Sequence, residues 1–137
     1  MLAAYRSAVF LSPADSMPGD FFVVTACNPF GQKSSPSKNK EKQACLANQI
    51  DALEIARFAV AGMNIERAHV EPGYGVECDL ETALKLGRQY DQDAIFRVSK
   101  SELSLVACSN GPEEKLGKFV CFRSVSYTHL TLPTNCV

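Results

Sequence analysis

His69 and Glu71 are the two residues whose types and spacing most directly suggest chemistry. On an extended segment, residues two apart point to the same face, so the imidazole and the carboxylate would lie side by side. A carboxylate that orients a histidine can support general acid–base catalysis. Two such groups are too few to hold a metal ion, and we predict no metal site. Alternatively, they form a half-exposed polar pair that leads into a turn at Pro72 and Gly73, or Glu71 caps a neighbouring loop.

Asn28 is a third candidate, because it directly follows an uncharged apolar run over residues 21–27. The phenylalanines, valines and Thr25 of that run are typical of a central strand that is covered on both faces. Pro29 ends the strand, since proline has no N–H for the sheet. A short amide on such a rigid support is well placed to bind a ligand. The alternative is that Asn28 only bonds its own backbone in a turn before Gly31.

Further polar side chains lie at the ends of predicted elements or in turns, where they could converge on one site. Arg88 could bind an anion, although an arginine on a helix more often faces solvent. The catalytic candidates are His69, Glu71 and Asn28, and the ligand-binding candidates are Thr25, Asn28, Gln32, Asn39, Arg88 and Gln92. There is no nucleophile elbow, P-loop or GxGxxG motif, and no cofactor is predicted.

The elements that must position these groups are a mixture of strands and helices. Ser35 as N-cap and Pro36 at the first helical position predict a helix that ends near Glu54, with Leu46, Ile50 and Leu53 buried and Gln43 facing solvent. Asp79 predicts the start of a second helix that ends near Tyr90. Strands are predicted over residues 5–11, 21–27, 56–62, 76–78, 94–98 and 103–108, with a last one beginning at 119 and a loop over 109–118.

This order of elements predicts a single α+β domain over residues 1–123, with two layers. We expect a mixed or mostly antiparallel sheet with the two main helices on one face. A length of 137 residues with 46% hydrophobic content suits one compact core.

Composition argues against two classes of partner. A charged fraction of 21% and a net charge of −1 lack the basic character of a nucleic-acid-binding protein. No apolar run approaches the roughly 18 residues needed to span a bilayer. We therefore predict no nucleic-acid and no membrane partner.

The cysteines and the N-terminus favour a cytoplasmic location. Residues 1–6 lack a basic segment that leads into an apolar one, so no signal peptide is expected. The chain has six cysteines, none in a C-x-x-C spacing. The five at positions 27, 45, 78, 108 and 121 are interpreted as free thiols of a cytoplasmic protein rather than disulfides or zinc ligands.

The C-terminal segment, residues 124–137, looks foreign to the domain. The stretch VSYTHLTLPT resembles the translation of a transposon-derived sequencing adapter. We expect it to be a non-native, disordered tail that replaces the natural C-terminus beyond about Arg123. His69 is then the native histidine that remains.

Four motifs in order resemble the bacterial family called domain of unknown function 3293. They are VTACNP at 24–29, a polar helix start containing Asn39, HVEPGYG at 69–75 and LGRQYDQDAIF at 86–96. The resemblance covers about residues 5–108. It implies a small stand-alone cytoplasmic domain and supplies no established activity.

Two functions are therefore expected from the sequence. The first is the binding of a small ligand or a protein partner at the surface formed by Asn28, His69 and Glu71. The alternative is a small hydrolase or transferase that uses His69 and Glu71 as an acid–base pair, with Asn28 as a polarising donor. Whether the protein is an enzyme is left open.

Overall fold

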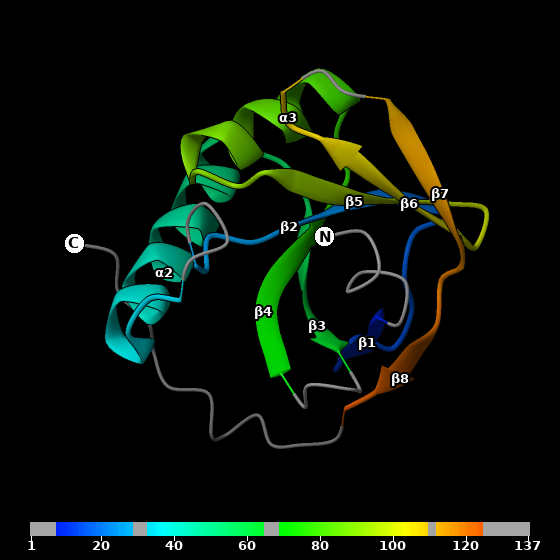
Figure 1. The fold of residues 1–137 in the computed structure, drawn as a ribbon, viewed down its shortest axis with the longest axis horizontal. Coiled ribbons are helices and arrows are strands. Elements are labelled where there is room, and N and C mark those ends of the chain that lie inside the picture. The colour runs from blue at the N-terminus through cyan, green and yellow to red at the C-terminus, as the bar shows by residue number, and fades with distance from the viewer. Residues whose placement is uncertain (1–7, 29–32, 65–68, 110–111, 125–137) are drawn as a thin grey trace.

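The computed structural model describes residues 8–28, 33–64, 69–109 and 112–124, without the side chains of Ala8, Asn64 and His69. Two helices and eight strands lie within these ranges (Figure 1). In chain order they are β1 (Ala8–Ser12), β2 (Asp20–Val24), α2 (Pro36–Ala52), β3 (Arg57–Asn64), β4 (His69–Val76), α3 (Leu80–Gln89), β5 (Ala94–Ser99), β6 (Glu102–Ala107), β7 (Glu113–Lys118) and β8 (Cys121–Arg123). No helix in the described ranges is both long and apolar enough to cross a membrane.

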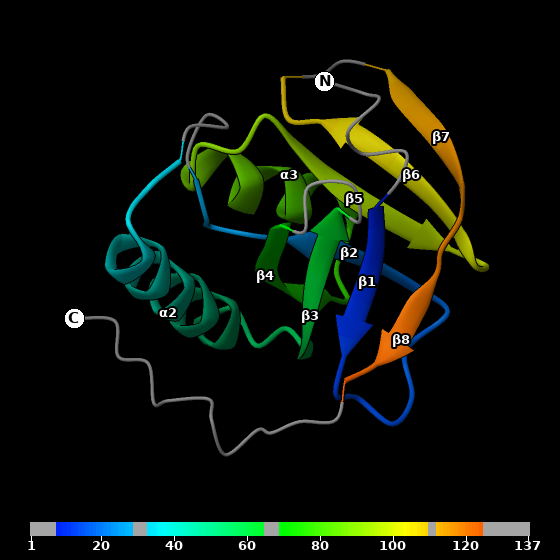
Figure 2. The ribbon, with the colours of Figure 1, turned by 60° about the horizontal axis from the view of Figure 1, so that its bottom comes forward.

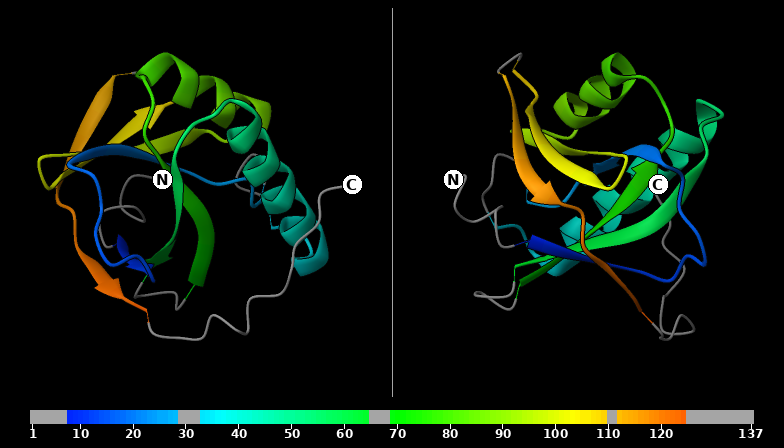
Figure 3. Two further views of the ribbon diagram at one scale, coloured as in Figure 1. Left: turned by 180° about the vertical axis from the view of Figure 1, so that it is seen from behind. Right: turned by 90° about the vertical axis from the view of Figure 1, so that its right-hand side faces the viewer.

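The strands form one sheet in the order β7-β6-β5-β2-β4-β3-β1-β8. The β1–β8 pair is parallel, and the other pairs are antiparallel. β7 and β8 lie at opposite edges although only Phe119 and Val120 separate them, so the sheet must curl to bring its edges together. Backbone hydrogen bonds from Phe119 N to Ser101 O (2.8 Å) and from Phe10 N to Val120 O (2.9 Å) hold this crossing. The curl is visible from behind and from the side (Figure 3).

β2 lies near the middle of the sheet and contributes to two separate cores. Phe22 and Val24 face the helices and pack with Leu46, Ile50 and Leu86 among others. Phe21 and Val23 face the inside of the curl, where Phe10, Val60, Val98 and Leu103 complete the second core. α2 and α3 lie outside the curled sheet, on one face (Figures 1 and 2). The predicted α+β class, the mostly antiparallel sheet and the doubly covered central strand are confirmed.

The predicted helix starts are also confirmed. The Ser35 side chain accepts a hydrogen bond from Lys38 N at 3.2 Å, with Pro36 at the first helical position. The Asp79 side chain accepts from Thr82 N at 3.0 Å. The sequence after residue 54 forms a strand rather than a longer helix, as predicted, although β3 continues to Asn64. The prediction that Leu53 is buried is wrong, because it lies at the C-cap of α2 and is 49% exposed.

The prediction of a turn at Pro72 and Gly73 is wrong, because both residues lie inside β4. A Cβ at Gly73 would be 2.7 Å from Val24 O, and one at Gly75 would be 2.2 Å from Phe58 Cζ. The glycines therefore permit close packing within a strand, a use that sequence alone does not separate from a turn. Pro72 is tolerated because β2 pairs only with residues 74–76 of β4 and leaves one side open there.

Three strand predictions also differ from the structure. The strand predicted over residues 76–78 is wrong, because β4 begins at His69 and ends at Val76. The run over 109–118 was predicted as a loop, yet it contains β7. β7 is an edge strand rich in charged residues, a composition that discourages edge-to-edge association. For the same reason it lacks the alternation of apolar and polar residues by which a strand is predicted from sequence. β2 ends at Val24, so Thr25, Ala26 and Cys27 belong to the segment that follows it.

Candidate functional site

Asn28 joins three segments of the chain through its side chain. Its Nδ2 donates to Glu71 Oε2 on β4 at 3.0 Å. Its Oδ1 accepts from Ser34 N and from Asn39 Nδ2 on α2, both at 2.9 Å. Asn39 Oδ1 in turn accepts from the backbone N–H of Asn28 at 2.9 Å. Asn28 has φ +50°, a left-handed conformation that asparagine tolerates better than most residues.

Thr25 and Gln43 hold the segment that leads from β2 to Asn28. Thr25 Oγ1 donates to Pro72 O at 2.7 Å and lies 3.2 Å from Gln43 Oε1. It also accepts from Cys27 N at 3.1 Å. Gln43 Oε1 accepts from Ala26 N at 2.6 Å. The prediction that Gln43 faces solvent is therefore wrong, since only 7% of this residue is exposed.

Gln92 closes the other side of the segment. Its Nε2 donates to Cys27 O at 2.9 Å and to Tyr90 O at 3.1 Å. We call the set Thr25, Asn28, Asn39, Gln43, Glu71 and Gln92 the Asn28 cluster. Its members come from four stretches that are far apart in the sequence.

Three predicted site residues are not placed in this cluster by the described contacts. Arg88 Nη1 donates to Cys108 O at 2.9 Å, and its Nη2 lies 3.7 Å from Glu81 Oε2. Gln32 lies outside the described residues, as does the side chain of His69, whose backbone begins β4. The structure thus brings together five predicted residues, namely Thr25, Asn28, Asn39, Glu71 and Gln92.

Gln43 was missed as a site residue, although the sequence held a signal for it. It precedes Leu46 by three positions and Ile50 by seven, which places it on the buried face of α2. Its polar type, by contrast, predicts solvent exposure. A buried glutamine is stable there because the backbone after β2 supplies donors that the sheet does not use.

The thiol nearest the cluster in sequence, that of Cys27, has a raised pKa. Burial raises the pKa of Cys27 from 9.0 to about 11, and only the hydrogen bond with Thr25 opposes this shift. Cys27, Cys78, Cys108 and Cys121 are free, as predicted. Cys45, half-buried on α2, is disulfide-bonded, so the prediction of a free thiol is wrong there. No group of histidine, cysteine and carboxylate side chains among the described residues could hold a metal ion.

The chemistry available to the cluster is directional hydrogen bonding. Amides and a hydroxyl supply most of its polar atoms, and one carboxylate, that of Glu71, supplies charge. The bond between Ser34 N and Asn28 Oδ1 ties together the two ends of the segment 28–34. The cluster can therefore fix a polar surface at the end of a buried strand.

Comparison with known proteins gives one family match. A family model described as "Protein of unknown function (DUF3293)" matches residues 24–95, which is more than half of the chain. The matched span begins at the last residue of β2 and ends in β5, so it contains every member of the Asn28 cluster. No curated protein and no solved structure matches the chain significantly.

Proposed function

The chain belongs to the DUF3293 family of proteins of unknown function, and we propose that it is a binding protein that recognises a small ligand or a protein partner around Asn28 and Glu71. The observation that carries the proposal is the 3.0 Å hydrogen bond between these two side chains, which are 43 residues apart in the sequence. It joins the end of a buried strand to β4 at a half-buried position, where a rigid polar surface meets solvent.

The make-up of the cluster favours binding over covalent chemistry. Asn28, Asn39, Gln43 and Gln92 do not titrate, so they cannot exchange protons with a substrate. Cys27 is the nearest thiol, and its raised pKa keeps it protonated and a poor nucleophile near neutral pH. Groups of this kind recognise a ligand by the position of its donors and acceptors.

The second candidate is a small hydrolase or transferase in which His69 and Glu71 act as an acid–base pair. It is favoured by one observation, the contact of Glu71 with Asn28, which would place a polarising amide beside the carboxylate. A carboxylate held by an amide could orient a neighbouring imidazole.

We also propose a bacterial origin and a cytoplasmic location, with neither nucleic acid nor membrane as partner. Four of the five cysteines among the described residues are free thiols, which suit a reducing compartment, whereas Cys45 is disulfide-bonded. The net charge of −1 gives no electrostatic reason to bind a polyanion.

Thermal unfolding against a panel of nucleotides, sugar phosphates, amino acids and divalent metals tests the binding proposal. A ligand at 100 times its dissociation constant adds about 2.7 kcal/mol, which raises the melting temperature by several degrees. We expect the shift in the wild type to be lost in Glu71→Gln. It should persist in Glu77→Gln, a matched control because Glu77 is exposed just beyond the end of β4. Equal shifts in all three proteins would contradict binding at this surface.

The same panel separates the two candidate functions. A ligand that is bound and recovered unchanged supports the binding protein. Conversion of a bound ester, amide or phosphate, with loss of turnover in both Glu71→Gln and His69→Ala, would favour the enzyme instead.

A further inference from the structure

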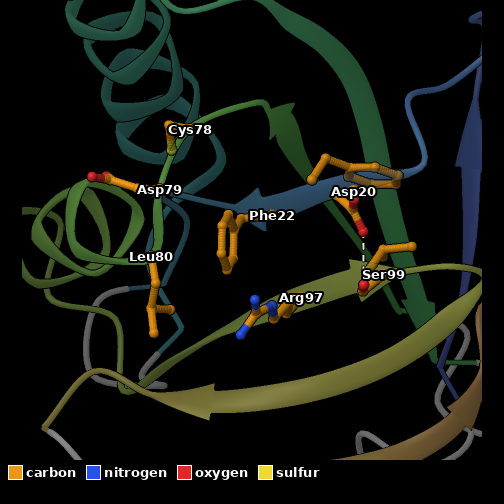
Figure 4. A pocket seen from close by; sticks show the side chains of 9 residues that line it. Asp20, Phe22, Cys78, Asp79, Leu80, Arg97 and Ser99 are labelled. Atoms are coloured by element: carbon orange, nitrogen blue, oxygen red, sulfur yellow. Dashed lines mark hydrogen bonds between the residues drawn. The ribbon is translucent and has the colours of Figure 1, made fainter.

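A cavity lies at the opposite end of β2 from the Asn28 cluster. It has a volume of about 390 Å³ and opens between the start of α3 and the first residues of β2 and the last of β5. This volume is within the range of pockets that hold small ligands, roughly 300–1,000 Å³. Phe22 and Leu80 supply apolar walls, and the side chain of Arg97 lies on the strand next to Phe22 (Figure 4).

Arg97 is a charged group that the protein leaves partly unsatisfied. Its guanidinium lies 5.5 Å from the centre of the Phe22 ring, a cation–π contact. Its Nη1 forms an ion pair with Glu113 Oε1 at 3.2 Å, with 40% of the arginine side chain exposed. Among the described residues, Nη2 and Nε have no hydrogen-bond partner. The three N–H groups on these two nitrogens therefore remain for an anionic group, and arginine suits a planar carboxylate especially well.

Asp20 provides the opposite charge at the same cavity. Its Oδ1 accepts from Ser99 Oγ at 2.7 Å, which fixes the carboxylate at one end of the opening (Figure 4). Asp20 pairs with Ser99 in the sheet, and Phe22 pairs with Arg97. Asp20 and Arg97 are therefore on the same face of neighbouring strands, offset by two residues or about 7 Å along the strand.

Asp79 also lines the cavity, but its carboxylate is already hydrogen-bonded to the backbone of α3. Its carboxylate caps α3, and the hydrogen bond to Thr82 lowers its pKa, so it stays ionised. The lining thus carries two negative charges and one positive charge. A ligand that is only anionic would approach two carboxylates, and a ligand that is only cationic would approach Arg97. A ligand with both charges avoids both conflicts.

We propose that this cavity binds a zwitterionic small molecule with an apolar body, of the class of α-amino acids with apolar side chains. The ligand carboxylate pairs with Arg97, its ammonium group pairs with Asp20, and its side chain packs on Phe22 and Leu80. Side chains at diagonal positions on neighbouring strands are within reach of one small molecule, so a ligand whose two charges are separated by a single carbon atom can form a hydrogen bond with each.

Titrations of the full chain followed by amide chemical shifts in NMR spectra test this proposal with three matched probes. L-phenylalanine carries both charges, 3-phenylpropionate carries only the carboxylate, and phenethylamine carries only the ammonium group. We expect saturable shifts around residues 20–22, 79–80 and 97–99 with L-phenylalanine. Its dissociation constant should be at least about ten times lower than that of either single-charge probe, since each lost charge-assisted contact costs about tenfold or more.

Variants assign the two charges separately. Arg97→Gln and Asp20→Asn should each weaken binding of L-phenylalanine about tenfold or more. Glu113→Gln is the matched control, because it removes the ion pair of Arg97 but no group that lines the cavity. It should bind at least as tightly as the wild type. Equal affinity for all three probes, shifts at other residues, or unchanged binding in both Arg97→Gln and Asp20→Asn would overturn the proposal.

Discussion

The polar side chains at the two ends of β2 differ in how far the protein itself satisfies their hydrogen-bonding groups. Beyond its last residue, the Asn28 cluster satisfies its donors and acceptors largely through one another and through nearby backbone groups. At its first residue, Asp20 and Arg97 flank a cavity, and part of the hydrogen-bonding capacity of Arg97 faces solvent. A buried network stabilises the fold and fixes a surface, whereas exposed charges beside a cavity stabilise little and remain available to a ligand. Substitutions in the Asn28 cluster should therefore lower stability as well as ligand binding at that surface. Substitutions of Asp20 and Arg97 should act on binding with little effect on stability.

The largest loss of stability is expected from Gln43→Ala. The substitution leaves the buried N–H of Ala26 without its acceptor and opens a small cavity under α2. We expect a loss of about 3 kcal/mol in the free energy of unfolding, measured by urea denaturation. Lys42→Ala, at the exposed neighbouring position of the same helix, should cost about 0.5 kcal/mol or less. Equal losses would show that the buried network contributes little.

Asn28 should give the next largest effect, and two substitutions separate its causes. Asn28→Ala removes the hydrogen bonds to Ser34, Asn39 and Glu71 and also strains the left-handed backbone, for a cost of about 2–3 kcal/mol. Asn28→Gly removes the same bonds without strain and should cost about 1 kcal/mol less. Urea denaturation of both variants provides the measurement. Identical losses would contradict the left-handed conformation.

A smaller effect should appear in the pH dependence of stability. The folded state holds the thiol proton of Cys27 more tightly than the unfolded state, because burial raises its pKa from 9.0 to about 11. The resulting stabilisation is complete below pH 9 and is lost as the pH rises from about 9 to about 11. Urea denaturation at neutral pH and near pH 10.5 should therefore show a smaller decline in Cys27→Ala than in the wild type. An equal decline in both proteins would contradict a buried thiol.

The smallest effect on stability is expected at the cavity. Arg97→Gln removes an ion pair whose side chains are 40% and 36% exposed, so unfolding should change by about 0.5 kcal/mol. Urea denaturation of this variant beside Gln43→Ala compares the two ends of β2 directly. A loss at Arg97 as large as that at Gln43 would remove the distinction between them.

Much of the fold could be predicted because local signals and burial agreed. Ser35 with Pro36 and Asp79 mark helix starts by hydrogen-bonding chemistry that acts within one turn. The apolar run from Phe21 supplies both cores because neighbouring residues of a strand face opposite sides. The curl of the sheet could not be predicted, since it depends on the pairing of β8 with β1, at the far edge from β7.

The sequence predicts most residues of the candidate site but not how these residues contact one another. Asn28 and Glu71 were singled out separately, and the structure joins them through a direct bond. Gln43 was not predicted as a site residue, because a polar residue on an apolar helix face is expected at the solvent-exposed margin. Its burial depends on the backbone N–H of Ala26, which the sequence does not place beside it. Arg97 gave no signal, because a single arginine in a strand is usually a solvent-facing residue. Its place beside Asp20 follows from the register of β2 with β5.

A double-mutant cycle between Asn28 and Glu71 tests the central claim, that polar groups from distant segments act as one unit at the end of β2. Urea denaturation of Asn28→Gly, Glu71→Ala and the double variant should give a coupling free energy of about 1 kcal/mol, as expected for one part-buried hydrogen bond to a carboxylate. A parallel cycle with Glu77→Ala should be additive within about 0.3 kcal/mol. Additivity in both cycles would contradict the account.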